Sequence, residues 1–162
     1  MSLYSRFAST ALISAALLTA TAALPALAAG FSEFNGSWSG TGTVHPQGGS
    51  PERIRCNATY QPQGDNNLNV HIRCASDSYN FDLSGQLSTD GTSIRGQWTE
   101  NSRGVGGTAS GTVRGDRMQV HVEGSGFSAD MGISTRGRRQ DVTMESHAAG
   151  EIVRGNIGMN RH

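Results

Sequence analysis

The feature that most constrains this chain is a period-two alternation of apolar and polar residues, which runs from about residue 37 almost to the C-terminus. Ile54, Cys56, Ala58 and Tyr60 share one face of such a segment, and polar residues occupy the other. The same alternation recurs in segment after segment as far as Met159. Successive side chains of a strand point to opposite faces, so this pattern is typical of half-buried antiparallel strands. The sequence therefore predicts an all-β fold.

Turn residues separate the alternating segments at short intervals. Asp90-Gly91, Gly115-Asp116 and Arg136-Gly137 are suited to tight hairpins, and residues 46–51 and 62–67 to longer hairpin loops. Short connections predict an antiparallel up-and-down meander of about eight to ten strands. Closing such a meander into a small β-barrel removes its exposed edges. A two-sheet β-sandwich is the alternative.

The first 28 residues carry the layout of a secretory signal peptide. Arg6 provides a positive start, residues 11–23 are apolar, and Pro25 precedes Ala26-Leu27-Ala28, an A-x-A cleavage site. The apolar run is shorter than the roughly 20 residues of a membrane anchor. We expect a signal peptide at 1–28 and a single exported β-barrel domain at 29–162, in the periplasm or secreted. No later stretch is apolar enough to span a membrane.

The two cysteines, Cys56 and Cys74, both lie in the exported part, where a disulfide is the default. Pairing them face to face places Ala58 opposite Ile72 and keeps the apolar residues on one side. Directly opposed residues of antiparallel strands are close enough for a disulfide. A redox-active pair would be expected in C-x-x-C spacing, which is absent.

Charge is balanced at 13 basic and 13 acidic residues, so a nucleic-acid partner is not expected. All 13 basic residues are arginine. Arg136, Arg138 and Arg139 form the one local cluster, either a solvated hairpin tip or a contact site for an anionic partner such as a lipid head group or an acidic sugar.

Four aromatic residues fall on the predicted inward face, where several glycines accompany them. These residues, the candidate ligand-binding set, are Trp38, Tyr60, Phe81 and Trp98. The rings could fill the space that the glycines leave and form a solid core. Alternatively, the glycines could leave a cavity lined by rings, as in barrels that hold one small apolar ligand.

No catalytic constellation is present. The chain has no G-x-S-x-G, no H-E-x-x-H and no phosphate-binding glycine loop before a helix, and no histidine spacing is diagnostic of a metal. Glu100 is the main carboxylate on the inward face. We expect a protein that is not an enzyme and needs no cofactor or metal.

Gly36-Ser37-Trp38 resembles the G-x-W start of the calycin barrels, which include the lipocalins and avidins. Residues 34–40 (FNGSWSG) and 73–76 (RCAS) resemble small exported β-barrel proteins of Gram-negative bacteria, a group without an assigned activity. These resemblances imply a calycin-like β-barrel in the periplasm. They imply no activity.

Together these observations favour a monomeric, disulfide-bonded, non-enzymatic barrel that binds a small apolar or lipid-like ligand or an envelope component. The alternative is a protein-interaction module, such as an inhibitor of an exported hydrolase, which would need loops and surface in place of a cavity.

Overall fold

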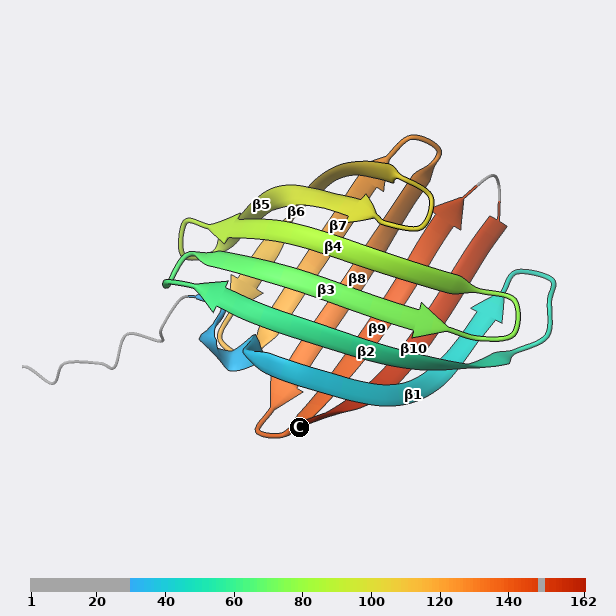
Figure 1. Cartoon of the computed structure of the whole chain (residues 1–162), viewed down its shortest axis with the longest axis horizontal. Coiled ribbons are helices and arrows are strands. Elements are labelled where there is room, and N and C mark those ends of the chain that lie inside the picture. The colour runs from blue at the N-terminus through green and yellow to red at the C-terminus, as the bar shows by residue number, and fades with distance from the viewer. Residues whose placement is uncertain (1–29, 149–150) are drawn as a thin grey trace, which may run out of the picture.

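The computed structural model describes residues 30–148 and 151–162 (Figure 1), so the predicted signal peptide lies outside the described residues. A short 3-10 helix, η1 (Ser32–Phe34), precedes the strands. Ten strands follow: β1 (Gly36–Pro46), β2 (Glu52–Gln63), β3 (Asn67–Ala75), β4 (Asn80–Thr89), β5 (Ser93–Glu100), β6 (Val105–Arg114), β7 (Arg117–Gly124), β8 (Phe127–Arg136), β9 (Arg139–Ala148) and β10 (Glu151–Arg161). Within the described ranges, no helix has the length and apolarity needed to cross a membrane.

The strands form one closed antiparallel barrel. Each strand pairs with its neighbour in sequence, and β1 pairs with β10 to complete the ring. Figure 1 shows the wall curving continuously from β1 through β10. The predicted up-and-down barrel is confirmed, at the upper end of the expected strand number, and the β-sandwich alternative is wrong.

The predicted disulfide and its register are confirmed. Cys56 and Cys74 are bonded with their Cα atoms 4.1 Å apart, and Ala58 lies opposite Ile72. The β2–β3 loop is shorter than the predicted 62–67, because Pro62 still pairs with Leu68. A proline near a strand end removes only one N–H donor from the ladder, so pairing continues past it.

Most inward-facing glycines lie where the backbones of neighbouring strands approach closely, which the sequence did not predict. A Cβ atom added to Gly42 would lie 1.9 Å from the Asn156 carbonyl oxygen of β10, and one added to Gly40 would lie equally close to that of Gly158. The backbones of β1 and β10 therefore approach too closely for any side chain at these positions. Gly85 differs, because an added Cβ would meet only ordinary contacts at 3.7 Å.

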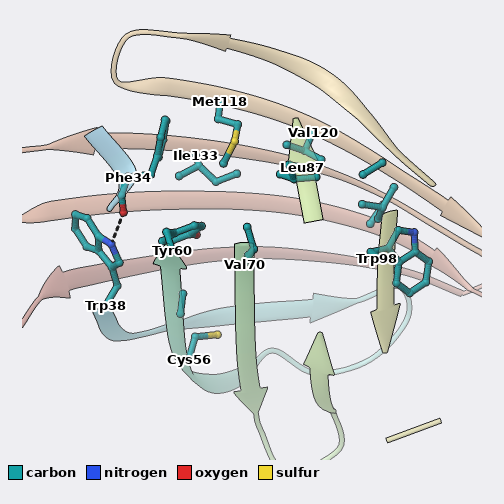
Figure 2. Close-up of a cluster of buried hydrophobic side chains, with 14 of the residues drawn as sticks. Phe34, Trp38, Cys56, Tyr60, Val70, Leu87, Trp98, Met118, Val120 and Ile133 are labelled. Atoms are coloured by element: carbon teal, nitrogen blue, oxygen red, sulfur yellow. Dashed lines mark hydrogen bonds between the residues drawn. The ribbon is translucent and has the colours of Figure 1, made fainter. Parts of the chain in front are cut away.

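One end of the barrel, called the closed end below, is plugged by η1 and its neighbours. Phe31 and Phe34 are fully buried there. Trp38 donates its indole N–H to the Phe34 carbonyl at 2.9 Å (Figure 2), and the Arg161 guanidinium carbon lies 4.5 Å from the centre of the Trp38 ring. This hydrogen bond and the cation–π contact stabilise the plug. These buried side chains fill much of the interior at this end.

Candidate ligand-binding cavity

The opposite end of the barrel, called the open end, contains a cavity of about 420 Å³. The hairpins β1–β2, β3–β4, β5–β6 and β7–β8 turn at this end (Figure 1). A volume of this size lies within the range of small-molecule pockets. The cavity is lined by Val44, Ile54, Tyr79, Asn80, Phe81, Leu83, Trp98, Glu100, Arg103, Val105, Val122, Ser125, Phe127, Ala129, Met131, Met144, Ser146, Ala148, Glu151 and Val153.

The deeper lining is apolar and adaptable. Met131 and Met144 face each other across the β8–β9 pair, and both line the cavity. Methionine side chains are flexible and polarisable, so they can follow the shapes of different apolar ligands. A second void of about 80 Å³ lies deeper in the barrel and shares these two methionines with the cavity.

Glu100 fastens one side of the mouth. Its side chain is 8% exposed, and its oxygens accept hydrogen bonds from the backbone N–H groups of Asp82 at 3.0 Å and Arg103 at 2.6 Å. Burial by itself would raise the pKa of Glu100, but these two hydrogen bonds, a hydrogen bond from Ser102 and the charge of Arg103 together hold the pKa below its ordinary value. Arg103 also pairs with Glu100 at 3.3 Å. Through these contacts, the Glu100 carboxylate joins the β5–β6 loop to β4.

A second set of contacts ties the β3–β4 loop to β10 and to the neighbouring strand β2. The Tyr79 hydroxyl donates to Glu151 at the start of β10 at 2.7 Å. Glu52 at the start of β2 accepts from the Ser76 hydroxyl at 2.8 Å and from the Ser78 N–H at 2.9 Å. The bond to Glu151, burial, and the negative charges of Glu151 and Glu52 raise the pKa of Tyr79 to about 12.

The structure brings two of the four predicted aromatic residues to the cavity. Phe81 and Trp98 line it, and the Trp98 ring packs on Phe127 with centroids 5.5 Å apart. Tyr60 borders only the deeper void. Its hydroxyl donates to Gln140 at 3.2 Å, and burial raises its pKa. Trp38 belongs to the plug of the closed end and does not line the cavity. Figure 2 shows Trp38 and Trp98 at opposite ends of the core.

Sequence reasoning did not select the residues at the mouth. Tyr79 and Phe127 share the inward parity, but parity does not say which end of a barrel a residue occupies. Arg103 lies in a loop, where the period-two pattern carries no information. The predicted role of Glu100 as the main inward carboxylate matches its burial.

The arginine cluster lies at the other end of the molecule from the cavity mouth. Arg136, Arg138 and Arg139 surround the exposed β8–β9 turn at the closed end. Arg138 donates to the Arg161 carbonyl at 2.9 Å, and Arg139 pairs with Asp141 at 3.3 Å. An anionic partner for this cluster stays a prediction.

In the part of the chain that the structure describes, no three histidine, cysteine or acidic side chains are grouped so as to hold a metal ion. Three histidines instead each contact a single carboxylate: His71 contacts Asp82, His121 contacts Asp130 and His147 contacts Glu145.

Comparison with known proteins finds relatives by structure alone. No family model matches the chain, and no curated protein matches it. The crystal structure of Rv2717c from M. tuberculosis superposes with a TM-score of 0.66 at 18% identity, covering 86% of this chain and 98% of that one. The S-type phycobiliprotein lyase CPES from Guillardia theta superposes with a TM-score of 0.63 at 12% identity, covering 82% and 90%. The barrel EF1p2_mFAP2b, bound to DFHBI, has a TM-score of 0.51 at 10% identity, covering 85% and 100%.

These similarities at low identity concern the fold. They agree with a calycin-like barrel, as the G-x-W resemblance implies.

Proposed function

We propose that this protein is a non-enzymatic, monomeric binding protein that holds a small apolar or lipid-like ligand inside its barrel. The observation that carries the proposal is the cavity of about 420 Å³ at the open end, above a plugged closed end. A barrel with one sealed and one open end can remove an apolar molecule from water and release it by the same route. Burial of the ligand's apolar surface would provide most of the binding free energy.

The structural relatives support this use of the fold. One of them, EF1p2_mFAP2b, is bound to the small molecule DFHBI. The chain described here presents a comparable barrel in which Phe81 and Trp98 line the cavity.

We place the protein outside the cytoplasm, in the periplasm or secreted. The Cys56–Cys74 bond supports this location, because disulfides persist in oxidising compartments. The signal-peptide pattern of residues 1–28 points the same way.

Ligand binding can be tested with the neutral, apolar dye N-phenyl-1-naphthylamine, whose fluorescence rises in apolar surroundings. Ala129 is buried and lines the cavity, so Ala129→Phe should fill the space and abolish the rise. Leu83→Ala enlarges the same cavity and should keep dye binding while favouring bulkier ligands. The control Thr108→Phe adds an equal ring to the outer face and should bind like the parent.

If the folded parent protein does not bind the dye, or Ala129→Phe binds it equally well, the proposal is wrong. Recovery of a protein partner by pull-down, without any small molecule, would then favour the protein-interaction alternative.

A further inference from the structure

The inner lining of the cavity offers a ligand few polar groups, and their donor hydrogens are already used. The Trp98 indole N–H donates to the Glu123 carbonyl at 3.2 Å, and Ser146 donates to Val153 at 3.5 Å. Among the described residues, the one buried side-chain polar atom without a partner is Arg161 Nε, which lies at the closed end. A polar ligand group pushed into the cavity would lose most of its hydrogen bonds to water and regain few of them. Any polar group of the ligand must therefore stay at the mouth.

The mouth offers two carboxylates and one guanidinium among its lining residues, namely Glu100, Glu151 and Arg103. Glu100 and Arg103 are already paired with each other, and Arg103 also donates to the Asn80 carbonyl at 3.2 Å. Glu151 receives only the neutral Tyr79 hydroxyl, and within the described ranges no cation pairs with it. The net charge that faces a ligand at the mouth is therefore negative.

Neighbouring groups strengthen this negative field. Glu52 is tied to the β3–β4 loop beside Tyr79 and likewise has no cationic partner among the described residues. After the hydrogen bond to Glu151 and burial, the charges of Glu151 and Glu52 also help to raise the pKa of Tyr79.

We propose that the ligand is a cationic amphiphile, with its apolar tail in the cavity and its positively charged head beside Glu151 at the mouth. This inference rests on the proposed function and names its ligand class. An anionic head, such as that of a fatty acid, would meet the repulsion of Glu151 and Glu52. A neutral head would gain no charge contact.

Three probes with the same alkyl chain separate these cases: decyltrimethylammonium, decanol and decanoate. Each is titrated against the complex of the protein with N-phenyl-1-naphthylamine at low ionic strength, and displacement of the dye reports its affinity. We expect the ammonium to bind about three- to fivefold more tightly than the alcohol, as for a partly exposed ion pair, and decanoate to bind most weakly. Added salt should shrink these differences.

Glu151→Gln removes the charge and keeps an oxygen that can accept the Tyr79 hydroxyl. In this variant the preference for the ammonium over the alcohol should vanish while the affinity for the alcohol stays unchanged. Glu123→Gln is the matched control, since Glu123 is an exposed carboxylate near the same end of the barrel that does not line the cavity. It should keep the preference.

Equal binding of the three probes, tighter binding of decanoate, or failure of all three to displace the dye would overturn the inference while leaving apolar binding intact. Absence of dye binding itself would instead overturn the proposed function.

Discussion

Tyr79 and Glu151 lie 72 positions apart in the sequence, yet their side chains meet at 2.7 Å across the mouth of the barrel. Tyr79 ends the β3–β4 loop and Glu151 begins β10, and two strands, β1 and β2, separate β10 from β3 in the wall. Their hydrogen bond thus links the β3–β4 loop to β10 beside the cavity that both residues line. This link between the loop and β10 depends on one hydroxyl group, that of Tyr79.

Replacing this hydroxyl should loosen the mouth. Tyr79→Phe keeps the ring and removes the bond to Glu151, so the loop can move away from β10 more often. We expect faster association and faster dissociation of the dye, with a smaller change in affinity. Stopped-flow fluorescence measures both rates. Unchanged rates would show that the Tyr79–Glu151 hydrogen bond does not limit the access of the dye to the cavity.

The same tyrosine should resist ionisation. Because its pKa is raised to about 12, Tyr79 stays neutral near pH 10, where a free tyrosine is half ionised. The stabilisation by its hydrogen bond is fully present below about pH 10 and is lost as the pH rises through about 12. Phenolate absorbance of residues 29–162 should therefore stay low at pH 10, and Tyr79→Phe should lack the step near pH 12. A full tyrosine step at pH 10 in the folded protein would contradict this.

Asp82 should make stability sensitive to acid. Hydrogen bonds from Asn101 and His71, with that of Arg73, lower its pKa to about 2 despite partial burial. Its contribution is fully present above the unfolded pKa of about 4 and is lost as the pH falls to about 2. Urea unfolding should show a steeper loss of the free energy of unfolding between pH 4 and 2 in the parent than in Asp82→Asn. Asp77→Asn, in an exposed loop, should behave like the parent.

The close approach of β1 and β10 can be tested by a matched pair of substitutions. In Gly42→Ala the new methyl group would overlap the Asn156 carbonyl, whereas in Gly85→Ala it finds ordinary contacts. We expect Gly42→Ala to lower the free energy of unfolding by about 1–3 kcal/mol, the usual range for overpacked sites, and Gly85→Ala to change it little. Equal stability of the two variants in thermal unfolding would disprove the packing explanation.

The disulfide should stabilise the barrel by restricting the unfolded chain. Its cysteines are 18 positions apart, and closing a loop of that size contributes about 3 kcal/mol. The double substitution Cys56→Ser and Cys74→Ser should lose about that much in urea unfolding. A reductant should lower the stability of the parent and leave the double variant unchanged; an equal effect on both would refute the assignment.

The barrel wall was predictable because it depends on parity, which the sequence displays directly. Pairing Cys56 with Cys74 sets one register, and the neighbouring pair Ala58 and Ile72 follows from it. Short turns then carry the same inward face from strand to strand. Gly91 and Gly115 have the positive φ that the hairpin predictions required.

The ends of the barrel were not predictable in the same way. Whether an inward residue packs in the plug or lines the cavity depends on how the loops and η1 cover each end of the barrel. The alternation of apolar and polar residues does not contain this information. Trp38 and Trp98 both point inward, but they lie at opposite ends of the barrel. Trp38 packs in the plug of the closed end, and Trp98 lines the cavity. The inward glycines suggested either a cavity or space filled by aromatic rings. In the structure, most of them instead allow the backbones of neighbouring strands to approach closely.

The most direct test of the central claim locates a bound apolar molecule by nuclear magnetic resonance of isotope-labelled methionine methyl groups. Met131 and Met144 line the cavity, whereas Met118 and Met159 border only the deeper void. Titration with N-phenyl-1-naphthylamine should shift the signals of Met131 and Met144 strongly and saturably, and those of Met118 and Met159 much less. Saturable binding that leaves Met131 and Met144 unshifted, or no binding to the folded protein, would contradict a ligand-holding barrel.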